Sequence, residues 1–246
     1  GDFVGAVEAL RLAGAATPVP GKDRSYIQSL IGHLEFQRGR LGAAAAQYRA
    51  ALAGLPGYPP ADAGLAEVEA ARGQSQEAIV RLRGVVERLP LPGYVISLAE
   101  LELATGRSAA ADEHLEFARA EERRHIASGE APDVEGAMFE ADHGDPVLAV
   151  RKAREVYAAA PSVRAADALG WALTRAGKPV QGLPFAERAL RLGSRDPRFL
   201  YHAGMAAKGS GEDAVGRRYL SRALGLNPSF SALYASRARA ALEELQ

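Results

Sequence analysis

Cysteine is absent from the 246 residues of this chain, and tryptophan occurs once, at Trp171. The lack of cysteine excludes disulfides, thiolate nucleophiles and thiolate metal sites. The lack of cysteine does not indicate the cellular compartment, because reducing and oxidising environments both tolerate a chain without cysteine. The cytoplasm and the cell envelope are therefore both open.

An excess of charge of either sign is also missing. Thirty Lys and Arg residues are matched by thirty Asp and Glu residues. Attraction of nucleic acid or of an anionic membrane surface requires excess positive charge, so we expect no nucleic-acid partner. Charged residues interrupt the apolar runs well before the roughly 20 residues that cross a bilayer, and we expect no membrane insertion.

Recognisable catalytic and cofactor motifs are lacking as well. The sequence has no serine elbow, phosphate loop or dinucleotide fingerprint, and its five histidines show no metal-ligand spacing. The densest polar cluster, Glu140 to Asp145 in "FEADHGD", falls at a predicted helix end and turn, where polar side chains satisfy backbone groups. We therefore predict a chain that is not an enzyme and holds no cofactor or metal ion.

A glycine recurs along the chain at intervals of 33, 34 or 38 residues. The recurring positions are Gly1, Gly39, Gly73, Gly106, Gly144, Gly177 and Gly211. Five residues after each glycine comes a residue with little or no side chain: Ala6, Ala44, Ala78, Ala111, Ala149, Gly182 and Gly216. Seventeen residues after five of them comes a proline: Pro18, Pro56, Pro90, Pro161 and Pro228.

This spacing predicts a repeated helical hairpin. A glycine just past a helix of about 12 to 14 residues supplies the positive φ that ends the helix and starts a tight turn. The small residues let the two helix backbones approach closely, and the proline marks the end of the second helix. One hairpin alone buries too little apolar area to fold, so the hairpins must stack.

At this point the chain resembles the tetratricopeptide repeat family, whose unit has small residues at fixed positions and a terminal proline. The resemblance is clearest from Asp167 to Pro228, and it implies an all-α, right-handed superhelical solenoid. In the first four hairpins the family's eleventh-position Tyr is replaced by glutamates, namely Glu35, Glu69, Glu102 and Glu140. The abundance of Ala, Gly and Arg is typical of a bacterial protein.

The repeat divides the chain into one continuous domain over residues 1–246. We expect hairpins at about 25–58, 59–91, 92–129, 130–162, 163–196 and 197–230, and a capping helix at 231–244. The extra residues around Glu121 to Glu130 predict a lengthened helix. Residues 1–18 match only the second helix of a unit, from which we expect a chain cut from a longer protein.

The resemblance implies a binding groove lined by the first helix of each hairpin. Carried over position by position, it predicts partner contacts at Tyr26, His33, Phe36, Glu67, Glu100, Glu135, Met138, Arg164, Asp167, Trp171, Arg175, Arg198, Tyr201, His202 and Met205. Trp171 and its aromatic neighbours form a partly apolar pocket in this interpretation; in the alternative they simply pack between hairpins. The positions at which some family members bind a peptide carboxylate hold Ser29, His33, Ala63 and Glu67, which disfavours that ligand.

The expected function is that of a non-catalytic scaffold that binds a protein or peptide in this groove. The alternative is a regulatory or sensory segment of a longer enzyme or transcription regulator. The exposed half-repeat at residues 1–18 also offers a surface for self-association.

Overall fold

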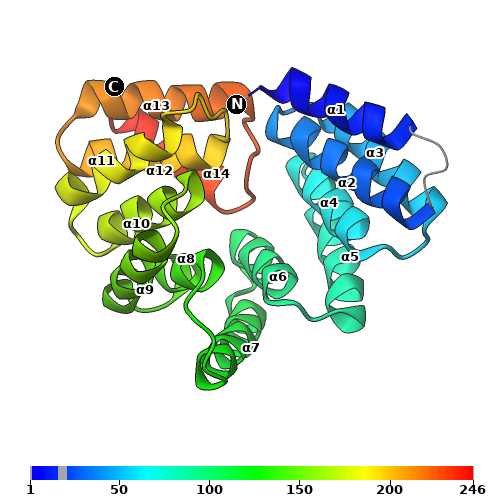
Figure 1. Cartoon of the computed structure of the whole chain (residues 1–246), viewed down its shortest axis with the longest axis horizontal. Coiled ribbons are helices and arrows are strands. Elements are labelled where there is room, and N and C mark those ends of the chain that lie inside the picture. Colours follow the sequence, from blue (N-terminus) through cyan, green and yellow to red (C-terminus); the bar gives the residue numbers. More distant parts are fainter. Residues whose placement is uncertain (1, 16–20, 246) are drawn as a thin grey trace. The chain divides into compact units, whose positions relative to one another are not determined.

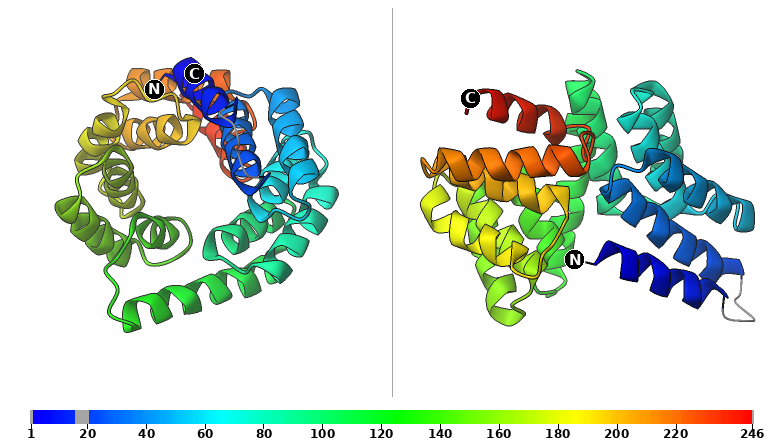
Figure 2. Two further views of the ribbon diagram at one scale, coloured as in Figure 1. Left: turned by 45° about the vertical axis from the view of Figure 1, so that its right-hand side comes forward. Right: turned by 90° about the horizontal axis from the view of Figure 1, so that it is seen from above.

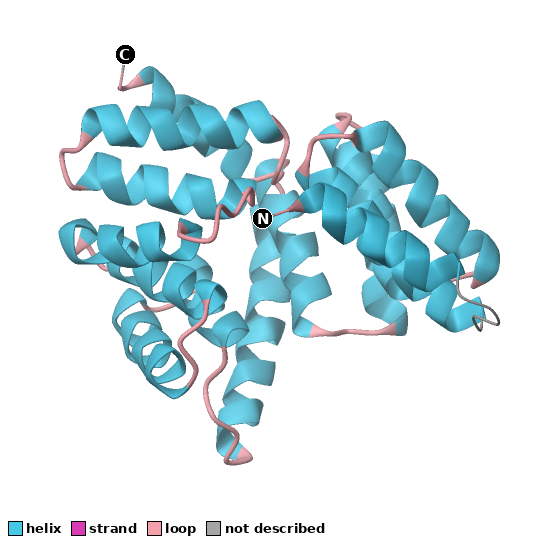
Figure 3. Cartoon of the chain, turned by 45° about the horizontal axis from the view of Figure 1, so that its top comes forward, coloured by secondary structure: helices cyan, strands magenta, loops and turns pink. Residues whose placement is uncertain are grey.

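The computed structural model describes residues 2–15 and 21–245, which form helices and connecting loops (Figure 1). No strand occurs in these ranges (Figure 3). The predicted fold class, an all-α solenoid of helix pairs, is confirmed. Within the same ranges, no helix is both long enough and apolar enough to cross a bilayer. Two residues used to find the repeat, Gly1 and Pro18, lie outside the described residues.

The chain forms two compact units, of which the N-terminal unit comprises Asp2–Ala118 and Leu226–Ala235. In this unit α2 pairs with α3 and α4 pairs with α5, while the first helices of these pairs, α2 and α4, also contact each other. The helices of the unit are α1 (Phe3–Ala15), α2 (Gly21–Gln37), α3 (Leu41–Gly54), α4 (Pro59–Ala71), α5 (Ser75–Arg88), α6 (Pro92–Ala104) and the first part of α7 (Ser108–Ala127).

The C-terminal unit comprises Arg119–Gly225 and residues 236–245. Its first helices α8, α10 and α12 contact one another in sequence order, and α9 and α11 pair with α8 and α10 (Figure 2). Its helices after α7 are α8 (Val134–His143), α9 (Pro146–Ala159), α10 (Val163–Arg175), α11 (Pro179–Leu190), α12 (Pro197–Gly209), α13 (Asp213–Leu226) and α14 (Tyr234–Glu243). The 20 residues of α7 confirm the lengthened helix. The single continuous domain stays a prediction.

Prolines mark both ends of the helices. Five helices carry a proline at the start, where the missing N–H has no partner in the helix anyway: α4, α6, α9, α11 and α12. Four second helices end two residues before the prolines of the repeat, Pro56, Pro90, Pro161 and Pro228. The proline ring would clash with the preceding turn of a continued helix, and a proline disfavours helical geometry at the residue before it. The predicted stop signals are confirmed at these four sites.

Five repeat glycines end their helices in the predicted way. Gly39, Gly73, Gly106, Gly177 and Gly211 have φ between 70° and 81°. The residue after each glycine donates its N–H to the carbonyl four residues before the glycine, over 2.8–2.9 Å. This is the bond that closes a Schellman turn, and it turns the chain back for the next helix.

At Gly144 the prediction of a positive φ is wrong, because its φ is −124°. Here the N–H of Asp145 donates to the carboxylate of Glu140 over 3.0 Å instead of to a backbone carbonyl. Glu140 occupies the same position, four residues before the glycine, that supplies the carbonyl in the other turns. Since its side chain reaches the N–H directly, the chain does not need the left-handed conformation.

Three of the four glutamates that replace the family's tyrosine contact a side chain on the second helix of their own hairpin, whereas Glu35 lies 3.7 Å from Arg38 and Arg40. Glu69 forms an ion pair with Arg81 at 2.8 Å and Glu140 with Lys152 at 3.2 Å, and Nδ1 of His114 lies 2.8 Å from the carboxylate of Glu102. Each base lies twelve residues after its glutamate, on the second helix. In the fifth and sixth hairpins the same positions hold apolar residues: Leu173 and Phe185, Ala207 and Tyr219. A buried carboxylate requires its partner, so these pairs fix how the two helices of a hairpin align.

The segment Leu226–Ala235 completes the N-terminal unit from a distant part of the sequence. The side-chain amide of Asn227, which is 1% exposed, donates to the carbonyl of Phe36 at the end of α2 over 2.7 Å. Gly39 makes this approach feasible, because a Cβ on it would lie 2.7 Å from the carbonyl oxygen of Leu226. The contact covers the end of α2, the first helix of the groove described next.

Candidate functional site

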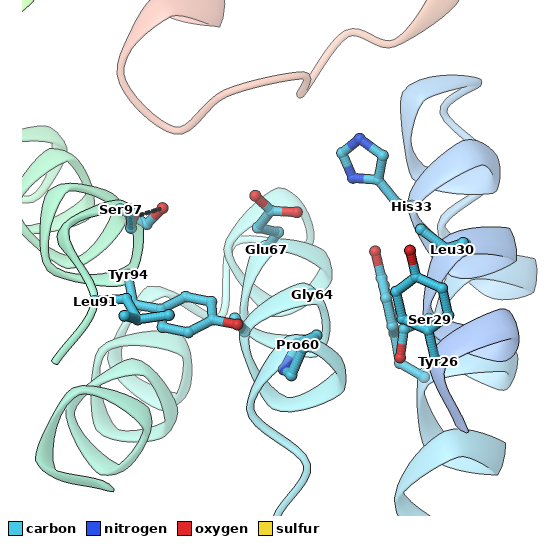
Figure 4. A pocket seen from close by; sticks show the side chains of 13 residues that line it. Tyr26, Ser29, Leu30, His33, Pro60, Gly64, Glu67, Leu91, Tyr94 and Ser97 are labelled. Carbon is cyan, nitrogen blue, oxygen red and sulfur yellow. Dashed lines mark hydrogen bonds between the residues drawn. The ribbon is translucent and has the colours of Figure 1, made fainter. Parts of the chain in front are cut away.

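An open cavity of about 410 Å³ lies on the first-helix side of the N-terminal unit (Figure 4). Its walls come from α2, α4 and α6, and we call it the α2–α4–α6 groove. The lining residues are Tyr26, Ser29, Leu30, His33, Tyr48, Pro60, Ala63, Gly64, Glu67, Leu91, Gly93, Tyr94 and Ser97.

Equivalent positions of successive repeats line the groove. On α2 the lining residues are Tyr26, Ser29, Leu30 and His33, and the matching positions on α4 are Pro60, Ala63, Gly64 and Glu67. A helix repeats about every 3.6 residues, so positions three and four apart share one face. The structure thereby brings three predicted partner contacts, Tyr26, His33 and Glu67, to one cavity.

Two glycines leave room for a tyrosine at the floor of the groove. A Cβ on Gly64 would overlap the phenol ring of Tyr48, and a Cβ on Gly32 would lie 2.7 Å from its Cε1 atom. Tyr48 belongs to α3, the second helix of its hairpin, and is 2% exposed. Its ring therefore reaches the groove from behind, in the space that the missing side chains of α2 and α4 leave.

Two tyrosines of the groove, Tyr48 and Tyr94, are neutral hydrogen-bonding groups near neutral pH. Burial raises the pKa of Tyr48 far above its usual value of 10, and the carboxylate of Glu67 raises it further. Burial also raises the pKa of Tyr94, with a smaller contribution from Tyr58. Phenols of this kind offer an apolar ring and a polar hydroxyl at once, a combination that is common at binding surfaces.

The polar groups of the groove differ in what they already bind. The hydroxyl of Ser29 donates to the carbonyl of Ser25, and that of Ser97 to Gly93, each over 2.9 Å within its own helix. His33 is exposed, and its Nε2 lies 3.1 Å from the side-chain amide of Gln37. Glu67 is half-buried and supplies the one permanent charge of the lining.

Two predicted partner contacts of the N-terminal unit lie outside the lining. Phe36 is 6% exposed and packs in the core with Tyr48 and Leu65. Glu100, on α6, is 8% exposed. Phe36 lies three residues after His33, and Glu100 occupies on α6 the repeat position that His33 and Glu67 hold on α2 and α4, although Glu100 is not part of the lining.

The predicted aromatic pocket of the C-terminal unit is filled by its own side chains. Trp171 stacks on His202 with ring centroids 4.4 Å apart, and the ring of Tyr201 lies 5.6 Å from that of Trp171. The indole N–H of Trp171 donates to Asp142 over 2.8 Å. The three aromatic side chains are at most 3% exposed. The arrangement matches the alternative that the sequence left open, packing between neighbouring hairpins.

The remaining predicted residues surround this cluster or lie at the surface. Asp167 is buried and lies 2.9 Å from Nδ1 of His202, while the guanidinium of Arg175 covers the Trp171 ring at 5.7 Å. Exposed Arg164 and Glu135 form an ion pair at 2.5 Å. Of the other three predicted contacts, Met138 and Met205 are half-buried and Arg198 is exposed.

The carboxylates of the "FEADHGD" segment bind side chains and backbone N–H groups of the same chain. Glu140 binds Lys152 and the N–H of Asp145. Asp142 accepts from Trp171, and Asp145 caps α9 by accepting from the N–H of Val147 over 2.8 Å. These contacts agree with the structural interpretation of the cluster, as groups that cap and join helices.

Sequence reasoning missed most of the lining residues, among them three large side chains. Tyr48 was missed because it belongs to a second helix, although Gly32 and Gly64 facing it were a usable signal. Tyr94 and Leu91 lie at the start of α6, away from the repeated groove positions. Two tyrosines of the lining thus follow from packing and not from the repeat register.

Comparison with known proteins places this geometry in context. Residues 35–98, which include α3, α4 and α5, match the model of a tetratricopeptide repeat family. A crystal structure of a tetratricopeptide repeat protein from Parabacteroides merdae has a TM-score of 0.52 and 14% sequence identity, covering 100% of this chain and 93% of that chain. No curated protein matches the sequence.

A second solved structure, the APC/C hetero-tetramer Cut9–Hcn1, has a TM-score of 0.53 and 15% identity. The match covers 99% of this chain and 47% of that chain, so this chain spans about half the length of that relative. At these identities the likeness shows a shared fold.

Proposed function

Because this chain is built of tetratricopeptide-type repeats, we propose that it is a non-catalytic scaffold whose α2–α4–α6 groove binds an extended segment of another polypeptide. The observation that carries the proposal is the cavity itself. Three consecutive first helices leave about 410 Å³ that their own side chains do not fill, whereas the aromatic cluster on α10 and α12 is closed. An unfilled space with fixed aromatic walls is typical of a binding site.

The size of the groove suits a short peptide segment. Neighbouring helix axes lie about 8–10 Å apart, so three first helices span roughly 16–20 Å. An extended chain advances about 3.3 Å per residue, and about five or six residues would cross the groove. Tyr26 and Tyr94 stand on its outer helices and would contact the two ends of such a segment.

The lining supports binding more than reaction. The hydroxyls of Ser29 and Ser97 already donate to carbonyls of their own helices, so neither is directed at a base. Aromatic side chains are the residues that most often dominate the free energy of protein–peptide binding. The groove therefore has the composition of a recognition surface.

The proposal is tested by a pair of tyrosine and phenylalanine variants. Tyr26 is 53% exposed, so Tyr26→Ala removes a groove wall while leaving the core intact. Phe117, which is 39% exposed on α7 in the same unit, serves as the control outside the groove. Each variant of the intact chain captures partners from its native cell extract, and mass spectrometry quantifies them.

We expect at least a tenfold loss of the principal partner with Tyr26→Ala and no loss with Phe117→Ala, since a binding hot spot contributes about 2 kcal/mol or more. If both variants captured the principal partner equally well, the groove would not be part of the binding surface.

A further inference from the structure

A tyrosine lies near the start of each of the three first helices that line the groove. Tyr26 is the sixth residue of α2, Tyr58 is the N-cap residue of α4, and Tyr94 is the third residue of α6. Figure 4 shows Tyr26 and Tyr94 on either side of Pro60, which follows Tyr58 by two residues. After burial, which is the larger cause, the phenol of Tyr26 raises the pKa of Tyr58, and the phenol of Tyr58 raises the pKa of Tyr94. The three residues therefore form a row along the groove, which we call the tyrosine row.

The tyrosine row offers ring surface and hydroxyl groups to an occupant. Tyr26 is 53% exposed, and Tyr58 and Tyr94 are partly exposed. Within residues 2–15 and 21–245, the hydroxyls of these three tyrosines form no hydrogen bond with another residue. Because the pKa values of Tyr58 and Tyr94 are raised, both phenols keep their protons near neutral pH. They can therefore donate hydrogen bonds to the carbonyl groups of an occupant.

The charges of the lining favour an uncharged occupant. Neither Lys nor Arg is among the 13 described residues that line the groove. Glu67 already interacts with other groups of the chain, and Nε2 of His33 lies 3.1 Å from the side-chain amide of Gln37. A charged side chain that entered the groove would lose hydration without gaining a partner of opposite charge. An uncharged segment is thus the electrostatically complementary one.

The geometry of a polyproline II helix matches the tyrosine row. This helix has three residues per turn and rises about 3.1 Å per residue, so each of its faces repeats about every 9 Å. Neighbouring helices lie about 8–10 Å apart, and every third residue of the segment would therefore meet the next tyrosine. Its carbonyls make no internal hydrogen bonds and can accept from the phenols. Prolines bring no N–H group that would need an acceptor in the groove.

We infer that the occupant of the α2–α4–α6 groove is an uncharged, proline-rich segment in the polyproline II conformation, with every third residue packed on a tyrosine of the row. This inference rests on the proposed function, since it requires a polypeptide in the groove. It adds the class of the segment and assigns Tyr58 and Tyr94 to its recognition. Proline-rich segments suit aromatic-lined grooves because they are already extended and lose little conformational entropy on binding.

The test measures the binding of fluorescein-labelled decaproline to the full chain by fluorescence anisotropy. A decapeptide of alternating glycine and serine, equally long and uncharged, is the matched peptide control. The protein variants are Tyr94→Ala, which removes a ring of the row, and Tyr94→Phe, which keeps the ring and removes the donor. Phe117→Ala, at a side chain that is 39% exposed on α7 in the same unit, is the control outside the groove.

We expect decaproline to bind roughly tenfold or more tightly than the glycine–serine peptide. Tyr94→Ala should weaken decaproline roughly tenfold, Tyr94→Phe about threefold, and Phe117→Ala not at all. Triproline spans about 9 Å and reaches at most two of the tyrosines, so it should bind the unaltered chain roughly tenfold more weakly than decaproline. This comparison on the unaltered chain keeps the test decisive if Tyr94→Ala fails to fold.

The outcomes separate this inference from the proposed function. The inference is overturned if decaproline binds no better than the glycine–serine peptide or than triproline, or if Tyr94→Ala leaves its affinity unchanged. Capture of the native partner by Tyr26→Ala reports on the proposed function separately. Loss of that partner without binding of decaproline would leave the groove as a site for another class of peptide, whereas its full retention would overturn the proposed function as well.

Discussion

Replacing Gly64 with alanine tests how the floor of the groove is built. The added Cβ would overlap the phenol ring of Tyr48, whose side chain is 2% exposed and packs in the core of the unit. Overpacking of this kind costs about 1–3 kcal/mol, while alanine gains roughly 1 kcal/mol over glycine in a helix interior. The difference is an expected net loss of up to about 2 kcal/mol in the free energy of unfolding.

Gly84 is the matched control, because it lies inside α5 and its Cβ would make only an ordinary van der Waals contact, 3.5 Å, with the guanidinium of Arg88. Gly84→Ala should therefore stabilise the chain by about 0.5–1 kcal/mol. In a Tyr48→Ala background the clash disappears, and Gly64→Ala should become stabilising by a similar amount.

Urea denaturation followed by far-ultraviolet circular dichroism measures all four variants. The reasoning is refuted if Gly64→Ala stabilises the chain as Gly84→Ala does while Tyr48 is present. Such a result would mean that Tyr48 does not occupy the space between α2 and α4.

Three further predictions concern other parts of the chain. Burial raises the pKa of Tyr201 from 10.0 to about 12. The neutral phenol therefore contributes roughly 2–3 kcal/mol to the free energy of unfolding, which is fully present below pH 10 and is lost as the pH rises to about 12. Tyr201→Phe should reduce this alkaline loss of stability in urea denaturation at pH 9 to 12. Lys152→Met leaves buried Glu140 without its ammonium partner and should lower the free energy of unfolding by about 3–5 kcal/mol; Glu140→Leu in the double variant should restore only part of this, because the N–H of Asp145 then loses its acceptor. Asn227→Ala removes one of the two donors to the carbonyl of Phe36, which keeps the N–H of Gly39, and should cost about 0.5–1.5 kcal/mol in urea denaturation; an unchanged midpoint would contradict the contact.

Much of the fold could be predicted because the repeat constrains the backbone at few, recognisable positions. Glycines such as Gly39 and Gly177 end helices through positive φ, and prolines such as Pro90 stop the second helix. Gly144 escaped this reasoning because a side chain, that of Glu140, replaced the backbone acceptor of the turn. A spacing pattern cannot distinguish these two ways of closing a turn.

The candidate site was predicted less completely, since repeat positions indicate a face of a helix and not what covers it. Tyr26 and Glu67 lie on the open part of that face, whereas Trp171 occupies an equivalent face and is buried by His202 and Tyr201. The size of the neighbouring side chains decides between these outcomes. At the second hairpin those neighbours are small, and the groove stays open.

Photo-cross-linking in the native cell tests the central claim, occupancy of the groove by a polypeptide, most directly. A photoreactive benzoylphenylalanine is placed at Leu30, inside the groove, or at Val80, which is 60% exposed on α5 in the same unit. The account predicts a discrete cross-linked polypeptide from Leu30 that is missing from Val80 and is lost on adding Tyr26→Ala. Cross-links of equal strength from both positions, or none from Leu30, would contradict it.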